Sequence, residues 1–145
     1  MLQYGAQTAV QPIPPGVAAH YDTTACWLSG LAPGGVTVTN ALLHAHLLGR
    51  RIWTDRLQRT GGGLLAKVGE VGRDNSWLFN NQYLIPLPAT TTLQNGDVLA
   101  LTCVYNSTGV ASVTTGGYST FNEMCIRRAS ASTTAELSHR DPRSL

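Results

Sequence analysis

The chain has 145 residues, of which 43% are hydrophobic and 12% are charged, and its formal net charge is +2. This length suits one ordinary domain, and the composition excludes a globally disordered chain. Because the Lys and Arg residues are dispersed, apart from Arg50–Arg51 and Arg127–Arg128, we expect neither a nucleic-acid surface nor a membrane surface.

The first residues show no signal peptide. The stretch "LQYGAQTAVQPIPPG" after Met1 has neither a basic segment nor an apolar one. No stretch of the sequence reaches the roughly 18–20 apolar residues of a membrane helix. The beginning resembles the interior of a longer protein, so we expect the chain to be a fragment.

Turn signals rich in Gly, Pro and Asn recur about every ten residues along the chain. Between them lie short segments rich in Val, Thr, Leu, Ile and Trp, which we predict as strands: 36–48, 51–58, 64–71, 78–87, 98–105, 110–115 and 124–128. No segment has a sustained helical period. This pattern is typical of an all-β fold, an antiparallel, jelly-roll-like β-sandwich. The polar run after residue 128 predicts a domain over 1–128 and a disordered tail over 129–145.

The predicted strand 36–48 carries two histidines in the run "LLHAHLLGR" (42–50). Side chains at positions i and i+2 of a strand point to the same face, so His44 and His46 should lie side by side, with Cα atoms roughly 6.5–7 Å apart. Two imidazoles at this spacing can bind one metal ion. They can equally lie on a polar face and bond to backbone carbonyls.

A metal site needs a third ligand, and the residues alone leave its identity open. Two histidines with one carboxylate suit zinc or non-haem iron. The available carboxylates are Asp55, Glu70, Asp74, Asp97 and Glu123. Met124 is the alternative, because a thioether is a soft ligand that favours Cu(I), although methionine is also a common core residue. His20 and His139, near the two ends of the sequence, are poor candidates.

The chain has three cysteines, Cys26, Cys103 and Cys125, which is an odd number. A disulfide between Cys103 and Cys125 would close a loop of roughly 20 residues and stabilise the fold by about 3 kcal/mol. Buried thiols in a reducing compartment are the alternative. Asn106 begins the sequon Asn-Ser-Thr, an acceptor of N-glycosylation in secreted proteins.

Four segments occur together in the order and spacing of one known family: "HAHLLGR" (44–50), "GRDNSW" (72–77), "NGDVLALTCVYN" (95–106) and "GGYSTFNEMC" (116–125). They resemble the C-terminal catalytic domain of the copper type II, ascorbate-dependent monooxygenases, in the branch of the dopamine and tyramine β-hydroxylases. The likeness covers roughly residues 3–126. It implies a jelly-roll-like β-sandwich, in agreement with the strand pattern.

The resemblance implies that His44, His46 and Met124 bind a copper ion that activates dioxygen, with no catalytic residue separate from these ligands. It also implies a Cys103–Cys125 disulfide, which indicates the secretory lumen or the extracellular space and makes glycosylation of Asn106 plausible. The expected function is ascorbate-dependent hydroxylation of an activated C–H bond in a small, aromatic amine-type substrate. A second copper ion is expected in an N-terminal domain of the same enzyme.

The sequence departs from the family in several places. It lacks the N-terminal copper domain, so we expect this chain alone to be inactive, as a fragment, a splice form or a truncated gene model. Asp22 stands where the branch has a cysteine, and the sequence after Cys125 diverges, so the family's disulfide through Cys26 is not expected. Leu42 replaces an arginine with which the peptide-amidating relatives hold a carboxylate, which disfavours a peptidylglycine substrate.

Two other functions remain as hypotheses. The first is a non-catalytic, secreted β-sandwich that keeps the copper ligands and serves as a binding module. The second is a zinc or iron hydrolase or oxygenase that uses His44, His46 and a carboxylate.

Overall fold

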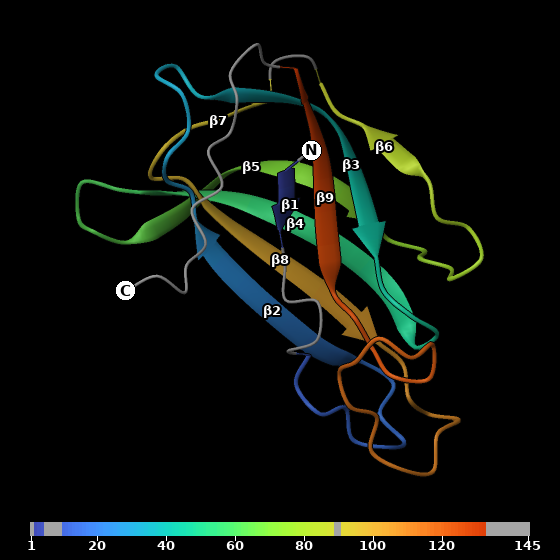
Figure 1. Ribbon diagram of the computed structural model, residues 1–145. Coiled ribbons are helices and arrows are strands. Elements are labelled where there is room, and N and C mark those ends of the chain that lie inside the picture. Colours follow the sequence, from blue (N-terminus) through green and yellow to red (C-terminus); the bar gives the residue numbers. More distant parts are fainter. Residues whose placement is uncertain (1, 5–9, 89–90, 133–145) are drawn as a thin grey trace.

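A computed structural model describes residues 2–4, 10–88 and 91–132 of the chain. Within these residues there is no helix, and the strands form two antiparallel sheets packed face to face (Figure 1). The strands are β1 (Leu2–Tyr4), β2 (His20–Trp27), β3 (Val36–His44), β4 (Gly49–Arg59), β5 (Leu65–Asp74), β6 (Leu84–Pro86), β7 (Thr92–Leu93), β8 (Val98–Tyr105) and β9 (Ile126–Ser132). The prediction of an all-β sandwich is confirmed.

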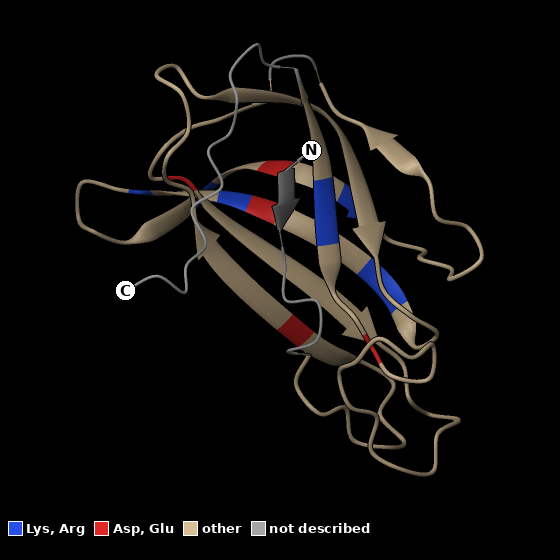
Figure 2. Ribbon diagram, viewed as in Figure 1, with Lys and Arg blue, Asp and Glu red and all other residues tan. Residues whose placement is uncertain are grey.

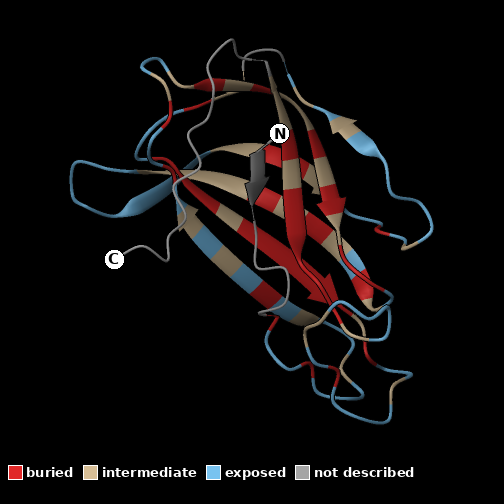
Figure 3. Cartoon of the chain, in the orientation of Figure 1, coloured by how far each residue is buried: buried red, intermediate tan, exposed pale blue. Residues whose placement is uncertain are grey.

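The first sheet has the strand order β1-β9-β3-β6, with β7 also paired to β3, and the second has the order β2-β8-β4-β5. Strands β3, β6 and β8 carry no Lys, Arg, Asp or Glu (Figure 2). The core lies between the sheets (Figure 3). Val38 and Leu43 from β3 and Ile52 and Leu101 from the second sheet are each at most 1% exposed.

A β-bulge in β3 decides which of its residues face the core. Val38 pairs with Ala131 of β9, and Asn40 pairs with the preceding residue of β9, so β3 contains one extra residue at this point. Before the bulge Val36 and Val38 are buried, and after it Ala41 and Leu43 are buried. An extra residue exchanges the two faces of a strand. The end of β3 therefore directs its even-numbered residues away from the core.

Not all of the strand predictions agree with the structure. Strand β2 was not predicted, because "HYDTTACW" contains few large apolar residues, yet it pairs with β8 along its whole length. The segment 110–115 was predicted as a strand, but only a single bridge joins its Thr114 to Ile13. Pairing with a neighbouring strand, and not hydrophobicity alone, decides both cases.

Strand β9 runs to Ser132, although we expected the domain to end at residue 128. Ala129 is only 1% exposed and pairs with Ala41 of β3. Small side chains, which made this segment look disordered, fit here against a neighbouring strand. Residues 133–145 of the expected tail lie outside the described residues.

A buried carboxylate fixes the end of the second sheet at which β8 begins. Asp97 accepts hydrogen bonds from Arg56 at 2.7 Å and 3.2 Å, from Gln58 at 2.7 Å and from the Gln94 amide at 2.8 Å. Burial by itself would raise the pKa of Asp97. The hydrogen bonds and the charge of Arg56 together outweigh burial, so the pKa lies below its ordinary value of 3.8.

The variant Asp97→Asn should be less stable than the wild type at pH 7 by about 1.5–3 kcal/mol, because hydrogen bonds to a charged group are lost. A carboxyl with a lowered folded-state pKa stabilises the fold above its unfolded pKa, and this contribution is lost as the pH falls through the folded pKa. The difference between variant and wild type should therefore shrink below about pH 4. Urea denaturation across pH measures it. A difference that is constant with pH would contradict the assignment, and Glu70→Gln, in a surface ion pair, is the control.

Candidate metal centre

His44 is the last residue of β3, and His46 lies in the turn that leads to β4. Their ring centroids are 5.1 Å apart, and the two rings are nearly perpendicular. The two histidines are therefore adjacent, as predicted, but the strand predicted to continue to residue 48 ends at His44. His46 is almost buried, at 6% exposure, whereas His44 is partly exposed.

The turn between the strands depends on a glycine. Gly49 donates a backbone hydrogen bond to the His46 carbonyl at 3.2 Å. A Cβ atom at position 49 would lie 2.8 Å from Ala45 Cβ and 2.8 Å from Trp77 Cδ1, which is too close for any side chain. The glycine of "HAHLLGR" and the tryptophan of "GRDNSW" thus meet at the turn that carries His46.

Both imidazoles are oriented through Nδ1. His46 Nδ1 lies 3.0 Å from the Asn122 carbonyl oxygen, which can only accept, so Nδ1 carries the hydrogen. His44 Nδ1 lies 2.8 Å from Gln82 Oε1. The Gln82 amide nitrogen donates to the Phe79 carbonyl, so its oxygen faces His44 and accepts from Nδ1. In its neutral form each ring then presents the lone pair of Nε2, the arrangement that metal-binding histidines use.

The pKa of His44 is lowered mainly by burial, which disfavours the imidazolium. The hydrogen bond to Gln82 acts in the opposite direction, and the nearby His46 and Arg128 lower the pKa further. His44 is therefore neutral at pH 7, which is the form that can donate a lone pair to a metal.

Glu123 joins the histidine turn to the segment that precedes β9. Its carboxylate accepts the amide of His46 at 2.9 Å and that of Leu48 at 2.7 Å, and it is 1% exposed. Burial raises the pKa of Glu123, and the hydrogen bonds from these backbone amides partly offset the rise. The Glu123 carboxylate thus accepts backbone amides just beyond the end of β3.

Met124 and its neighbour Cys125 are tied to β8. Cys125 forms a disulfide with Cys103 of β8, which confirms the expected pairing. The Tyr105 hydroxyl donates to the Met124 carbonyl at 2.9 Å. Burial raises the pKa of Tyr105, so the phenol remains protonated and able to donate. The Met124 side chain itself is 6% exposed.

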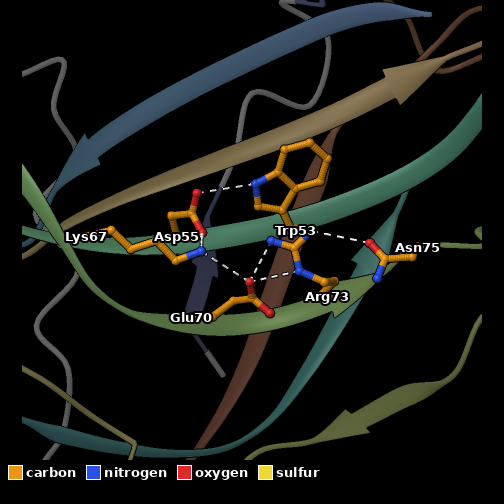
Figure 4. A network of polar contacts seen from close by, with 6 residues as sticks. All are labelled: Trp53, Asp55, Lys67, Glu70, Arg73 and Asn75. Atoms are coloured by element: carbon orange, nitrogen blue, oxygen red, sulfur yellow. Dashed lines mark hydrogen bonds and ion pairs between the residues drawn. The ribbon is translucent and has the colours of Figure 1, made fainter.

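Two of the candidate carboxylate ligands lie in a polar network on the second sheet (Figure 4). Glu70 accepts two hydrogen bonds from Arg73, at 2.6 Å and 2.8 Å, and Lys67 forms ion pairs with Glu70 and Asp55. The Trp53 indole donates to Asp55 at 3.3 Å. These carboxylates are engaged between β4 and β5, away from the histidines on the first sheet.

The remaining carboxylates also have other partners. Asp97 binds Arg56, Asp74 accepts the Ser76 amide at 2.8 Å, and Glu123 binds backbone amides. In the part of the chain that the structure describes, no three His, Cys, Asp or Glu side chains are close enough to hold a metal ion. The hypothesis of two histidines and a carboxylate thus has no support among the described residues.

Other predicted site residues lie elsewhere. Asn106 follows β8 and is partly exposed, and its side-chain oxygen accepts from the Thr108 hydroxyl at 2.7 Å. Cys26, on β2, is not part of the disulfide. His20, at the start of β2, has its ring centroid 6.5 Å from that of Tyr105. His139 lies outside the described residues.

Sequence reasoning missed the residues that orient the histidines. Gln82 lies far from His44 in the sequence, and the Asn122 contact uses a backbone carbonyl, so neither leaves a recognisable signal. Glu123 was considered only as a metal ligand. Glu123 directly precedes Met124 in the segment "GGYSTFNEMC", which resembles the family, and this position was a signal of a role at the site.

Comparison with known proteins shows the family of the chain. Residues 1–127 match the family described as copper type II ascorbate-dependent monooxygenase, C-terminal domain. The chain belongs to this family. The matched range spans the positions of both histidines, of Met124 and of both cysteines of the disulfide.

Several relatives in the monooxygenase family are similar to the chain. Tyramine beta-hydroxylase of Caenorhabditis briggsae is 36% identical over 92 residues, which cover 63% of this chain and 15% of the relative. Dopamine beta-hydroxylase of Rattus norvegicus is 32% identical over 127 residues, 82% of this chain and 19% of the relative. DBH-like monooxygenase protein 1 of Mus musculus is 36% identical over 121 residues, which cover 79% of this chain and 19% of the relative. The chain thus spans less than a fifth of the length of these relatives.

Proposed function

We propose that His44, His46 and Met124 bind one copper ion, and that this domain supplies the dioxygen-activating copper site of a monooxygenase. The observation that carries the proposal is the orientation of both imidazoles, each with Nδ1 bonded to an oxygen acceptor and Nε2 left to a ligand. Two neutral imidazoles and a thioether form a donor set that suits copper and stabilises Cu(I).

The residues around the site would keep these ligands in place. Asn122 and Gln82 fix the ring orientations, Glu123 fixes the backbone of His46, and the disulfide next to Met124 ties its segment to β8. When bound, a copper ion would supply dioxygen binding and one-electron chemistry at this position. The substrate of the whole enzyme would be hydroxylated at an activated C–H bond, with ascorbate as the reductant.

The chain would act together with a second copper site in an N-terminal domain of the same enzyme. The chain covers less than a fifth of the length of these relatives, which supports a second copper site in another part of the enzyme. The test is to assay ascorbate-dependent hydroxylation with the chain alone and with the chain joined to such a domain. Activity that appears only in the joined protein supports the enzyme. If neither protein is active, the chain is instead a non-catalytic copper-binding module.

We place the protein in an oxidising compartment, in the secretory lumen or outside the cell. The Cys103–Cys125 disulfide supports this location, since such bonds persist in oxidising surroundings. Asn106, partly exposed at the end of β8, would then be accessible for glycosylation. None of the described residues forms a helix long and apolar enough to cross a membrane.

Titration with Cu(I) tests the proposed ligands. The wild type should bind one Cu(I), His46→Ala should weaken binding on the order of 100-fold, and Met124→Leu about tenfold, because leucine keeps the volume of methionine without its sulfur. Zinc affinity should change little in Met124→Leu. The control is His139→Ala, which removes a histidine outside the proposed site. Unchanged Cu(I) affinity in Met124→Leu would exclude Met124 as a ligand.

A further inference from the structure

A cavity of about 220 Å³ opens beside His44. It is lined by Leu42, His44, Gln82, Ile126 and Arg128. Strands β3 and β9 run side by side in the first sheet (Figure 1), with Leu42 opposite Arg128 and His44 opposite Ile126. Since the bulge in β3 directs Leu42 and His44 away from the core, the cavity lies on the outer face of this sheet.

Arg128 is a permanently charged group in the lining of the cavity. Among the described residues that line it, Arg128 is the only Lys, Arg, Asp or Glu, and none of the ion pairs between described residues involves Arg128. Strands β3, β6 and β9 carry no acidic residue and show no red in Figure 2. Arg127, the neighbouring residue, points into the core instead and is fully buried.

We infer that Arg128 determines substrate specificity, and that the cavity binds a small molecule with an anionic group, such as a carboxylate, and an apolar body. The inference rests on the proposed function, because it assigns the substrate class of that copper site. A guanidinium binds a carboxylate through two parallel, charge-assisted hydrogen bonds. An ammonium group in the same cavity would meet a like charge, and none of the described residues that line the cavity has a carboxylate to balance it.

The positions of the lining residues also limit the size of the substrate. Arg128 lies diagonally across from His44 on the paired strand, a separation of roughly 7–8 Å between such positions. An anionic group bound by Arg128 is therefore a few bonds away from the part of the substrate nearest His44. Leu42 and Ile126 contact the apolar body between the two ends.

The family match ends at residue 127 and therefore does not include Arg128. The expectation of an aromatic amine came from the family resemblance alone. The positive charge of Arg128 instead favours a negatively charged substrate.

Ligand binding to the metal-free chain tests the inference without any requirement for activity. The probes are 3-phenylpropanoate and its amine counterpart 3-phenylpropylamine, followed by the NMR shifts of the His44 imidazole. We expect the carboxylate to bind and the amine to bind at least about tenfold more weakly. Arg128→Gln should weaken carboxylate binding at least about tenfold, and Arg128→Lys, which keeps the charge but not the paired hydrogen bonds, should be intermediate.

The control Arg51→Gln removes an arginine that contacts Tyr21 on the second sheet, and it should leave binding unchanged. Equal or tighter binding of the amine, or carboxylate binding that survives Arg128→Gln in a folded protein, would overturn the inference. Cu(I) titration of the same samples separates the two proposals. Arg128-dependent carboxylate binding in a protein without a Cu(I) site supports anion binding in the cavity and refutes only the copper site.

Discussion

Replacing both Cys103 and Cys125 with alanine should lower the free energy of unfolding by about 3 kcal/mol. The two residues are 22 positions apart, and a closed loop of this length restricts the unfolded chain by about that amount. Both cysteines are buried, so two small gaps add to the loss. Urea denaturation of wild type and variant measures the difference. A loss below about 1 kcal/mol would contradict this account of the disulfide.

The same variant should weaken Cu(I) binding if the proposed site is correct. Met124 directly precedes Cys125, so loss of the disulfide releases the chain beside the thioether from β8. The control is Cys26→Ala, because Cys26 lies outside the disulfide and on a different sheet from His44. Alkylation checks the starting state. The unreduced native protein should take up label at Cys26 alone, and reduced, unfolded protein should be labelled at every cysteine.

The variant Glu123→Ala should be destabilised by about 2–4 kcal/mol, because the amides of His46 and Leu48 then lack an acceptor in a buried place. Glu123→Gln keeps one acceptor oxygen and should lose roughly half as much. Without the carboxylate, the turn that carries His46 is no longer tied to the segment before β9. Thermal and urea unfolding of both variants measure the effect.

Copper titration of these variants separates a supporting role of Glu123 from metal ligation. If Glu123 only orients His46, Glu123→Gln should still bind one Cu(I), with affinity lower by about 10–100-fold. If its carboxylate were a ligand, the variant would lose the two-histidine, one-carboxylate site and its preference for zinc. A matched surface control is Glu70→Gln, which removes a carboxylate from the network between β4 and β5.

Local sequence patterns predicted the strands that have large apolar side chains. Strand β8 was predicted over 98–105, and the structure has it at Val98–Tyr105. Strand β2 was missed because it has few large apolar residues, and it is a strand through its pairing with β8. The segment 110–115 had a suitable composition, but only one bridge pairs it with another segment.

The candidate site shows the same division between local and tertiary information. The sequence by itself determined which candidate ligands and cysteines are present: two histidines at alternate positions, a soft methionine sulfur, and two cysteines that the family resemblance paired. Only the tertiary structure decided that His44 faces outward, because that depends on the bulge opposite β9. It also decided which nitrogen each imidazole presents, since Gln82 and the Asn122 carbonyl come from distant segments. The charge beside His44 was decided in the same way, because strand register places Arg128 opposite Leu42. Side-chain periodicity is a local property of the chain, whereas register and hydrogen-bond partners arise only when separate segments pack together.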